Sequence, residues 1–196
     1  MMAAMESGFN WGERLPELGA ARVGLRWLET ADVPALFEVF SDPEVMRYWS
    51  STPLVDLAAA AGLLRHIQDH FAARTLFQWG IARRADDRVI GTCTLFNLDV
   101  ENRRGEIGFA LGRAHWGQGL AAEAVGALIG FAFGALALHR LEADADPRNA
   151  ASLRALERQG FRREGYLRER FHVGGETQDS VFLGLLRREW TGGQTS

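Results

Sequence analysis

Apolar side chains recur along the chain with two different periods, and each period predicts a different kind of element. Residues 22–28 alternate polar and apolar side chains, which predicts a first strand. In residues 30–40 and 52–74 the apolar side chains recur every three or four positions, which predicts two amphipathic helices lying on a sheet. Residues 41–44 carry a capping residue followed by proline, so one short helical turn is expected between these helices.

Strands and helices follow one another in the rest of the chain. The turn Asp86-Asp87 separates two β-rich runs and predicts an antiparallel hairpin. The expected strands are 76–83, 88–98, 106–111, 140–145 and two within 161–186, and the expected helices are 120–138, apolar on nearly every side and hence deeply buried, and 149–159, ended by Gly160. This order predicts a mixed α/β fold (α+β), with a central mixed sheet and helices on both faces.

The chain shows no internal repeat, no low-complexity segment and no linker-like change of composition. Its 196 residues suit one domain, and a domain of this size can bury roughly 70% of its unfolded surface. We therefore expect a loose lead-in at residues 1–19, a single domain at residues 20–190 and a tail at residues 191–196.

Charge and cysteine content narrow the function classes. The net charge is −3 and the 22 basic residues are scattered in ones and twos, which argues against a nucleic-acid partner. Cys93, the only cysteine, lies in the apolar run 89–96, which favours core packing over nucleophilic chemistry. The N-terminus lacks the features of a secretory signal, and the longest apolar stretch, 124–138, is too short to span a bilayer comfortably. A cytoplasmic protein without membrane association is expected.

One loop carries a signal for anion binding. The segment Trp116-Gly117-Gln118-Gly119-Leu120-Ala121 leads directly into the expected buried helix. A helix N-terminus presents backbone N–H groups without intrahelical acceptors, and glycines leave those groups accessible to the oxygens of an anion. The loop therefore predicts a phosphate or diphosphate site, although a simple tight turn would use the same glycines. It matches neither the P-loop nor the dinucleotide-binding pattern.

This loop and an ordered series of other segments resemble the GNAT superfamily of N-acetyltransferases, in its RimJ/RimL-like branch. The family's diphosphate loop reads Gln/Arg-x-x-Gly-x-Gly/Ala, and Trp116 stands where Gln or Arg is usual. The other similar segments, in family order, are residues 41–46, 90–92, 104–109, 138–143, 149–152, 160–165 and 179–186. The resemblance implies the GNAT acyl-CoA N-acyltransferase fold, with a mostly antiparallel sheet and one splayed strand pair.

The resemblance also implies where acetyl-CoA would bind. Backbone N–H groups of residues 117–122 would hold the diphosphate, and Ala110 and Leu111 would offer backbone groups to the pantetheine arm in a wedge between residues 106–111 and 140–145. Gly108 suits a bulge where these strands part. The positions implied to contact the cofactor are Phe109, Ala110, Leu111, Trp116, Gly117, Gln118, Gly119, Leu120, Ala121, Ala122, Asn149 and Ser152.

Acetyl transfer to an amine needs a base, because an alkylamine with a pKa near ~10 is mostly protonated at neutral pH. Glu106 is the first choice, since it begins the strand beside the implied thioester. The alternative is a structural carboxylate paired with Arg103, Arg104 or Arg140. N–H groups freed where the strands splay would stabilise the oxyanion.

The departing thiolate benefits from an acid. Ser152 is the first choice because it matches the serine of the family's Asn-x-x-Ser, and its alternative role is capping of the helix that follows. Asn149 would cap that helix and touch the cofactor at once. Tyr166 is the second choice for the acid, and simple packing is its alternative role.

No metal site is expected. His66 and His70 have a spacing that zinc ligands use, but no third ligand is near them in the sequence. Glu123 lies in the first turn of the buried helix, where the helix dipole favours a carboxylate, and is expected to be structural. His139 is expected to cap the C-terminus of the same helix, and Trp49 to line an acceptor pocket.

The resemblance favours the N-terminal α-amine of a protein or peptide as the acetyl acceptor. A small-molecule amine (an amino acid, a polyamine or an antibiotic) stays open, because nothing in residues 41–75 distinguishes the two. A non-catalytic acyl-CoA-binding sensor and a nucleotide-binding regulator are alternatives from other classes. Homodimers are frequent among members of the family.

Overall fold

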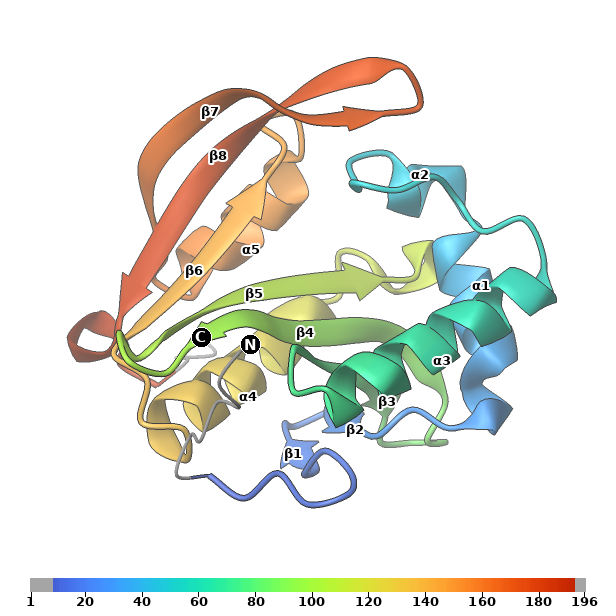
Figure 1. The fold of residues 1–196 in the computed structure, drawn as a ribbon, viewed down its shortest axis with the longest axis horizontal. Coiled ribbons are helices and arrows are strands. Elements are labelled where there is room, and N and C mark those ends of the chain that lie inside the picture. The colour runs from blue at the N-terminus through green and yellow to red at the C-terminus, as the bar shows by residue number, and fades with distance from the viewer. Residues whose placement is uncertain (1–8, 193–196) are drawn as a thin grey trace.

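The computed structural model describes residues 9–192, which form one eight-stranded sheet with helices on both faces (Figure 1). The strand order is β1-β2-β3-β4-β5-β6-β8-β7, and only the pair β5–β6 is parallel. The strands are β1 Leu18–Gly19, β2 Val23–Arg26, β3 Leu76–Arg83, β4 Val89–Asp99, β5 Arg104–Leu111, β6 Arg140–Ala145, β7 Arg162–Val173 and β8 Glu176–Leu186. The helices are α1 Val33–Phe40, α2 Pro43–Met46, α3 Leu57–Ala72, α4 Leu120–Gly134 and α5 Ala150–Arg158, with short 3-10 turns at Thr30–Asp32, Arg113–His115 and Arg187–Glu189. The predicted mixed sheet is confirmed.

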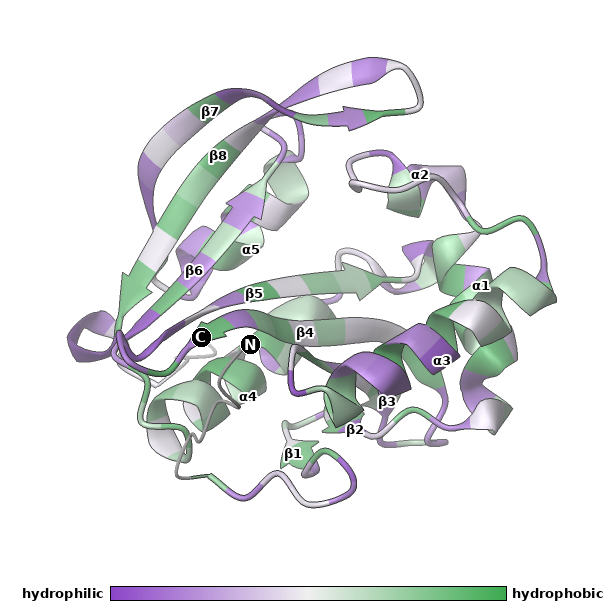
Figure 2. Ribbon diagram, in the orientation of Figure 1, coloured by the Kyte–Doolittle hydropathy of each residue, from purple (hydrophilic) through white to green (hydrophobic). Residues whose placement is uncertain are grey.

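The two faces of the sheet are covered by different helices. In Figure 1, α3 and α1 lie in front of β3 and β4, while α4 and α5 lie behind the sheet. Figure 2 shows the consequence in hydropathy: α4 is apolar along its length, whereas α3 turns a hydrophilic side outward. The face of β6, β8 and β7 that points forward in Figure 1 carries no helix.

The largest core lies between α4 and the sheet. Trp79 is fully buried and donates its indole N–H to the Pro16 carbonyl oxygen, 2.8 Å away. Cys93 is also fully buried, and burial raises the pKa of its thiol to about 12, so its thiolate is scarcely populated at neutral pH. The prediction that Cys93 packs in the core is confirmed.

The described part of the expected lead-in, residues 9–19, is mostly irregular but packs on the core. Trp11 stacks on Phe77 with ring centroids 3.9 Å apart, Leu15 is buried, and Leu18–Gly19 add a short strand to β2. Aromatic packing therefore fixes residues whose dispersed Gly, Pro and Glu pattern indicated a loop. Residues 1–8 of the lead-in and 193–196 of the expected tail lie outside the described residues.

Two helix boundaries differ from the sequence-based expectation. The helix expected from residue 52 starts at Leu57, because the Asp56 side chain accepts a hydrogen bond from the Ala59 amide and caps it. The buried helix expected to reach residue 138 ends at Gly134, so His139 does not cap it. Within residues 9–192, no helix combines the length and the hydropathy that a membrane crossing requires.

Candidate active site

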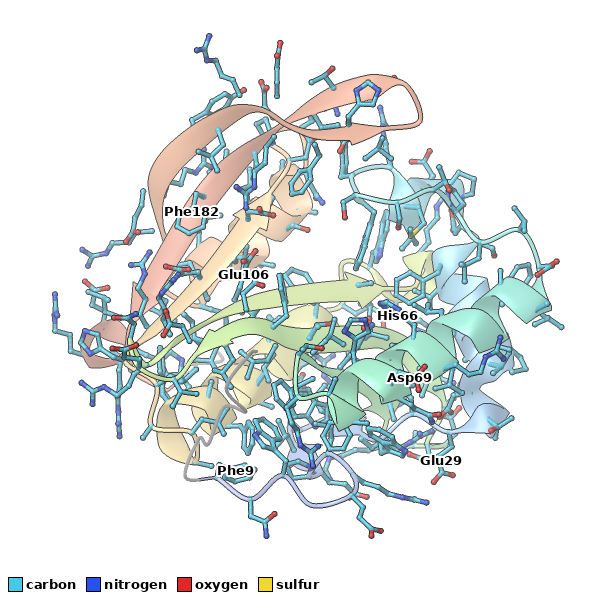
Figure 3. The ribbon with its side chains drawn as sticks, in the orientation of Figure 1. Phe9, Glu29, His66, Asp69, Glu106 and Phe182 are labelled. Atoms are coloured by element: carbon cyan, nitrogen blue, oxygen red, sulfur yellow. The ribbon has the colours of Figure 1, made fainter. Side chains whose placement is uncertain are left out.

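The two parallel strands β5 and β6 pair for only a short distance and then diverge. Their register joins Arg104 to Arg140, Gly105 to Leu141 and Glu106 to Glu142, and no pairing follows in the rest of the two strands. The splayed strand pair is therefore present, with Glu106 at its apex. Figure 3 places Glu106 between β5 and β6.

Glu106 is a buried carboxylate that forms no ion pair with any residue among 9–192. It is 8% exposed, and burial is the main cause that raises its pKa, with nearby Asp144 adding to the rise. The Asn97 side chain donates a hydrogen bond to Oε2 from 2.9 Å, which opposes the rise. The alternative of an ion pair is wrong, since Arg104 and Arg140 both bind Glu142 instead.

The other carboxylates on β6 and just after it are neutralised by arginines. Asp144 accepts a hydrogen bond from Nε of Arg170 on β7, 3.0 Å away. Asp146 is buried and bound by Arg148 through two guanidinium nitrogens. Glu106 is thus the one carboxylate of this group that no described cation pairs with.

The backbone of β5 presents alternate residues to the diverging side. Gly112 donates its amide N–H to Ile90, and because hydrogen-bonded pairs alternate along an antiparallel ladder, Ala110 turns its backbone groups toward β4. Phe109 and Leu111 turn theirs toward the edge that β6 has left. The register runs unbroken through Gly108, so the bulge expected there is absent and lies instead in β4, between Phe96 and Asp99.

The glycine loop leads into α4 with a left-handed backbone. Gly117 and Gly119 have φ of +72° and +77°, and Gly119 is the N-cap residue of α4 with no side-chain capping bond. A Cβ atom added to Gly117 would meet nothing within 4 Å, so the space beside its Cα is open. The first N–H groups of α4 have no acceptor within the helix, and this cradle fits an anion such as a diphosphate.

Neighbouring side chains hold the loop in place. Trp116 is 46% exposed and donates its indole N–H to the Leu111 carbonyl oxygen at 2.6 Å, which ties the loop to the end of β5. Arg22 donates to the Gln118 carbonyl and binds Glu123, whose side chain is nearly buried. Glu123 is structural, as expected. Of the remaining implied contacts, Leu120 is buried, and Ala121 and Ala122 are half-buried in the first turn of α4.

Asn149, and not Ser152, caps the start of α5, as expected for Asn149. The Asn149 side chain accepts a hydrogen bond from the Ser152 amide at 3.1 Å and caps α5. Because Asn149 is the cap, the capping role considered for Ser152 is wrong. The Ser152 hydroxyl is half-buried and has no hydrogen-bond partner among residues 9–192.

Tyr166 lies on the edge strand β7, and its side chain is 55% exposed. Its hydroxyl donates to Asp179 at 2.6 Å, and this bond raises the pKa of Tyr166. A tyrosine that already donates its proton to a carboxylate is a poor proton donor at neutral pH. The alternative of simple packing is wrong, because the Tyr166 side chain is largely exposed.

One contact across the site was not foreseen from the sequence. The Arg148 guanidinium, after β6, lies 5.6 Å from the ring centroid of Tyr48, which follows α2. Trp49, expected to line an acceptor pocket, is half-buried and packs edge-on against Phe40, in a hydrophobic cluster that α1 and α2 share. No sequence pattern marks Tyr48, because the two partners are a hundred residues apart in the chain.

Nothing in the described part of the chain assembles a metal site. His66 and His70 lie with tilted rings whose centroids are 4.1 Å apart, and His70 Nδ1 bonds to the Thr75 hydroxyl. No group of three or more His, Cys, Asp or Glu side chains within residues 9–192 has the arrangement that a metal ion needs.

A mixed sheet whose parallel strands diverge beside a glycine loop at a helix N-terminus defines the class of acyl-CoA N-acyltransferases. A family model described as "Acetyltransferase (GNAT) domain" matches residues 22–162. The chain therefore belongs to the GNAT acetyltransferase family and is an N-acetyltransferase, as the resemblance implied. Enzymes of this family use acetyl-CoA.

Individual relatives agree with this assignment. The uncharacterized N-acetyltransferase p20 of Bacillus licheniformis is 39% identical and covers 87% of this chain and 96% of its own. The [ribosomal protein uS5]-alanine N-acetyltransferase of Escherichia coli is 29% identical, covering 60% of this chain and 61% of its own. Among solved structures, the spermidine N-acetyltransferase of Vibrio cholerae with CoA and spermine superposes with a TM-score of 0.75 at 22% identity, covering 86% of this chain and 97% of the other.

Proposed function

We propose that this enzyme transfers the acetyl group of acetyl-CoA directly to a primary amine, with the N-terminal α-amine of a protein or peptide as acceptor. The observation that carries the proposal is Glu106, a buried carboxylate at the apex of the diverging strands that no described cation pairs with. Such a group can take a proton from an incoming ammonium, directly or through water.

The remaining roles follow from position. Residues 117–122 would hold the diphosphate on their amides, with Gly117 leaving the approach open. Phe109 and Leu111, rather than Ala110, would bond the pantetheine arm, because their backbone groups face the diverging edge. When bound, acetyl-CoA supplies an activated acetyl thioester.

In this proposal the proton inventory closes on two side chains. The amine nitrogen forms a bond to the acetyl carbon, Glu106 accepts the amine proton, and the carbon–sulfur bond breaks. Ser152 donates its hydroxyl proton to the leaving thiolate and is reprotonated from water, while Glu106 returns its proton to water, so that the products are the amide and free CoA thiol. The Ser152 hydroxyl carries no other bond among the described residues, while Asn149 caps the helix. Tyr166 is the second candidate, weakened by its bond to Asp179.

Charge supports an α-amine over a polyamine. An α-amine has a pKa near ~8, against ~10 for an alkylamine, so a carboxylate can deprotonate it far more readily. A polyamine carries several cations and calls for several free carboxylates, but Glu142, Asp144 and Asp146 are already bound by arginines. A small amine is the second candidate acceptor, because the fold is similar to that of the spermidine N-acetyltransferase.

Release of free CoA thiol tests the proposal on three acceptors: an alanine-starting peptide, the same peptide with a blocked N-terminus, and spermidine. We expect release with the free peptide alone, and a loss of about 100- to 1,000-fold in Glu106→Gln at neutral pH. Glu101→Gln, a change at an exposed turn, is the matched control. Turnover on spermidine alone contradicts the acceptor, full activity in Glu106→Gln contradicts the base, and binding without any release supports a sensor.

A further inference from the structure

Asn97 is the only described side chain that hydrogen-bonds the Glu106 carboxylate. Its Nδ2 donates to Oε2 over 2.9 Å, and Oε1 has no partner within residues 9–192. One carboxylate oxygen is therefore held and the other is left for proton exchange.

A β-bulge brings Asn97 to this position. The β4–β5 register runs from Phe96 opposite Glu106 to Asp99 opposite Arg104, so Asn97 and Leu98 together face the single residue Gly105. In regular pairing Asn97 would point to the face that Leu95 occupies. The extra residue places Leu98 in that core and turns Asn97 to the side of Glu106, since a Cβ on Gly105 would meet Leu98 at 3.3 Å.

The backbone of Asn97 suits its residue type. Its φ is +48°, in the left-handed region that asparagine tolerates better than most side chains. Asn97 is also exposed, so its amide lies between the buried carboxylate and solvent. The bulge thus combines an unusual backbone with a hydrogen bond to the proposed base.

The surroundings of Glu106 shift its pKa in opposite directions. Burial raises its pKa, and Asp144 and Glu142 on β6 add to the rise. The Asn97 hydrogen bond is the largest influence in the other direction, and Arg170 on β7 adds a smaller one. Hydrogen bonding to the ionised form keeps the carboxylate available as a base despite its burial.

We propose that Asn97 is a positioning residue for acetyl transfer: its amide fixes Oε2 of Glu106 and leaves Oε1 to take the proton of the acceptor. The inference rests on the proposed function, in which Glu106 is the base. In this inference the β4 bulge serves the site by placing Asn97 beside Glu106.

Two substitutions separate the hydrogen bond from the fold. Asn97→Gly keeps the left-handed backbone without strain and removes the donor, and Asn97→Asp keeps the size but replaces the donor with an acceptor. Asn102→Ala is the control, because it removes an amide that bonds only to Asp99 in the adjacent turn. The readouts are kcat/KM against pH with the alanine-starting peptide, and ¹³C NMR titration of glutamate carboxyls, with Glu106 assigned by its absence in Glu106→Gln.

Removing a bond to the ionised carboxylate moves its titration to higher pH, so the acid limb of kcat/KM moves the same way. We expect Asn97→Gly to lose about fivefold in kcat/KM near pH ~6 and less than about twofold near pH ~9, with a larger shift in Asn97→Asp. A loss that is uniform with pH, or an unchanged titration of Glu106, overturns the inference. Full activity in Glu106→Gln contradicts the proposed base instead, and the NMR titration still reports whether Asn97 tunes Glu106.

Discussion

The Glu106 side chain is ionisable yet only 8% exposed, and burying a charged group costs free energy. The pKa of Glu106 is raised in the folded state, so ionisation of this side chain destabilises the fold at pH values above the raised pKa. This free-energy cost vanishes at pH values below the pKa that Glu106 has in the unfolded chain. The residue that we propose as the base therefore weakens the fold at neutral pH.

Glu106→Gln is accordingly expected to be more stable than the wild type at neutral pH, with a free energy of unfolding larger by up to about 1 kcal/mol and a higher unfolding temperature. The same variant is expected to lose activity. The gain should shrink as the pH falls through the raised pKa of Glu106 and disappear below the ordinary range for glutamate. Thermal unfolding at a series of pH values measures it, with Glu101→Gln as the control. A stability gain that is independent of pH would contradict the assigned cause.

The sequence identifies single residues that belong to motifs, but it misses residues that only the folded backbone brings to the site. Glu106, Asn149 and the loop glycines stand out in the segments that resemble the family. Asn97 does not, because a bulge changes which face a strand residue occupies and no period of two reveals it. The expected capping of α5 by Asn149 is confirmed, whereas the capping role also considered for Ser152 is wrong.

The loop before α4 is the element on which cofactor binding depends. Gly117 has a φ of +72° and room for a Cβ, so Gly117→Ala strains the backbone and places a methyl group where the anion would approach. We expect a KM for acetyl-CoA raised about 10- to 100-fold, with kcat changed much less.

Gly134→Ala is the matched control for this prediction. Gly134 ends α4, has a negative φ and has no atom within 4 Å of the place that a Cβ would take, so the same change should leave the KM unaltered. Initial rates over a range of acetyl-CoA concentrations provide the measurement. An unchanged KM in Gly117→Ala would show that the loop does not contact the cofactor.

Elements with strong periodicity were predicted well: β3 and β6 begin and end at the predicted residues, whereas one end each of α3 and α4 was misplaced. The buried α4 and the β3–β4 hairpin lie where the pattern places them. The start of α3 moved from residue 52 to Leu57 because Asp56 is a better cap than the Thr-Pro pair, and the end of α4 moved to Gly134. Two short elements, β1 and the turn at Thr30–Asp32, depend on tertiary contacts that a local pattern does not contain.

At the scale of the whole molecule, Tyr48 and Arg148 link the segment after α2 to the loop after β6. Arg148 is anchored on Asp146, so its guanidinium is a fixed platform beside the Tyr48 ring. Figure 1 shows α2 across from β6 and α5, at the end where β5 and β6 have diverged. The contact therefore spans the side from which an acceptor would reach Glu106.

Tyr48→Ala is expected to raise the KM of the acceptor several-fold, by about 1 kcal/mol of lost contact, and to leave the KM of acetyl-CoA within about twofold. Arg47→Ala tests a neighbouring arginine that also contacts the Tyr48 ring but does not cross the site. Initial rates with each substrate varied in turn separate the two constants. Equal changes in both constants would contradict a role on the acceptor side.

Sequence order alone predicted a mixed sheet but not its topology. The parallel pairing of β5 with β6 and the insertion of β8 between β6 and β7 join residues far apart in the chain. The resemblance to the family supplied the splayed pair. The contact of Tyr48 with Arg148 follows from this topology and could be seen only once the sheet was assembled.

A crystal structure of the acetyl-CoA complex tests most directly whether the loop and the diverging strands form the cofactor site. We predict diphosphate oxygens within hydrogen-bonding distance of the amides of residues 117–122, and the thioester beside Glu106. Diphosphate density at any other place on the molecule, with these amides bonded to water alone, would contradict this assignment.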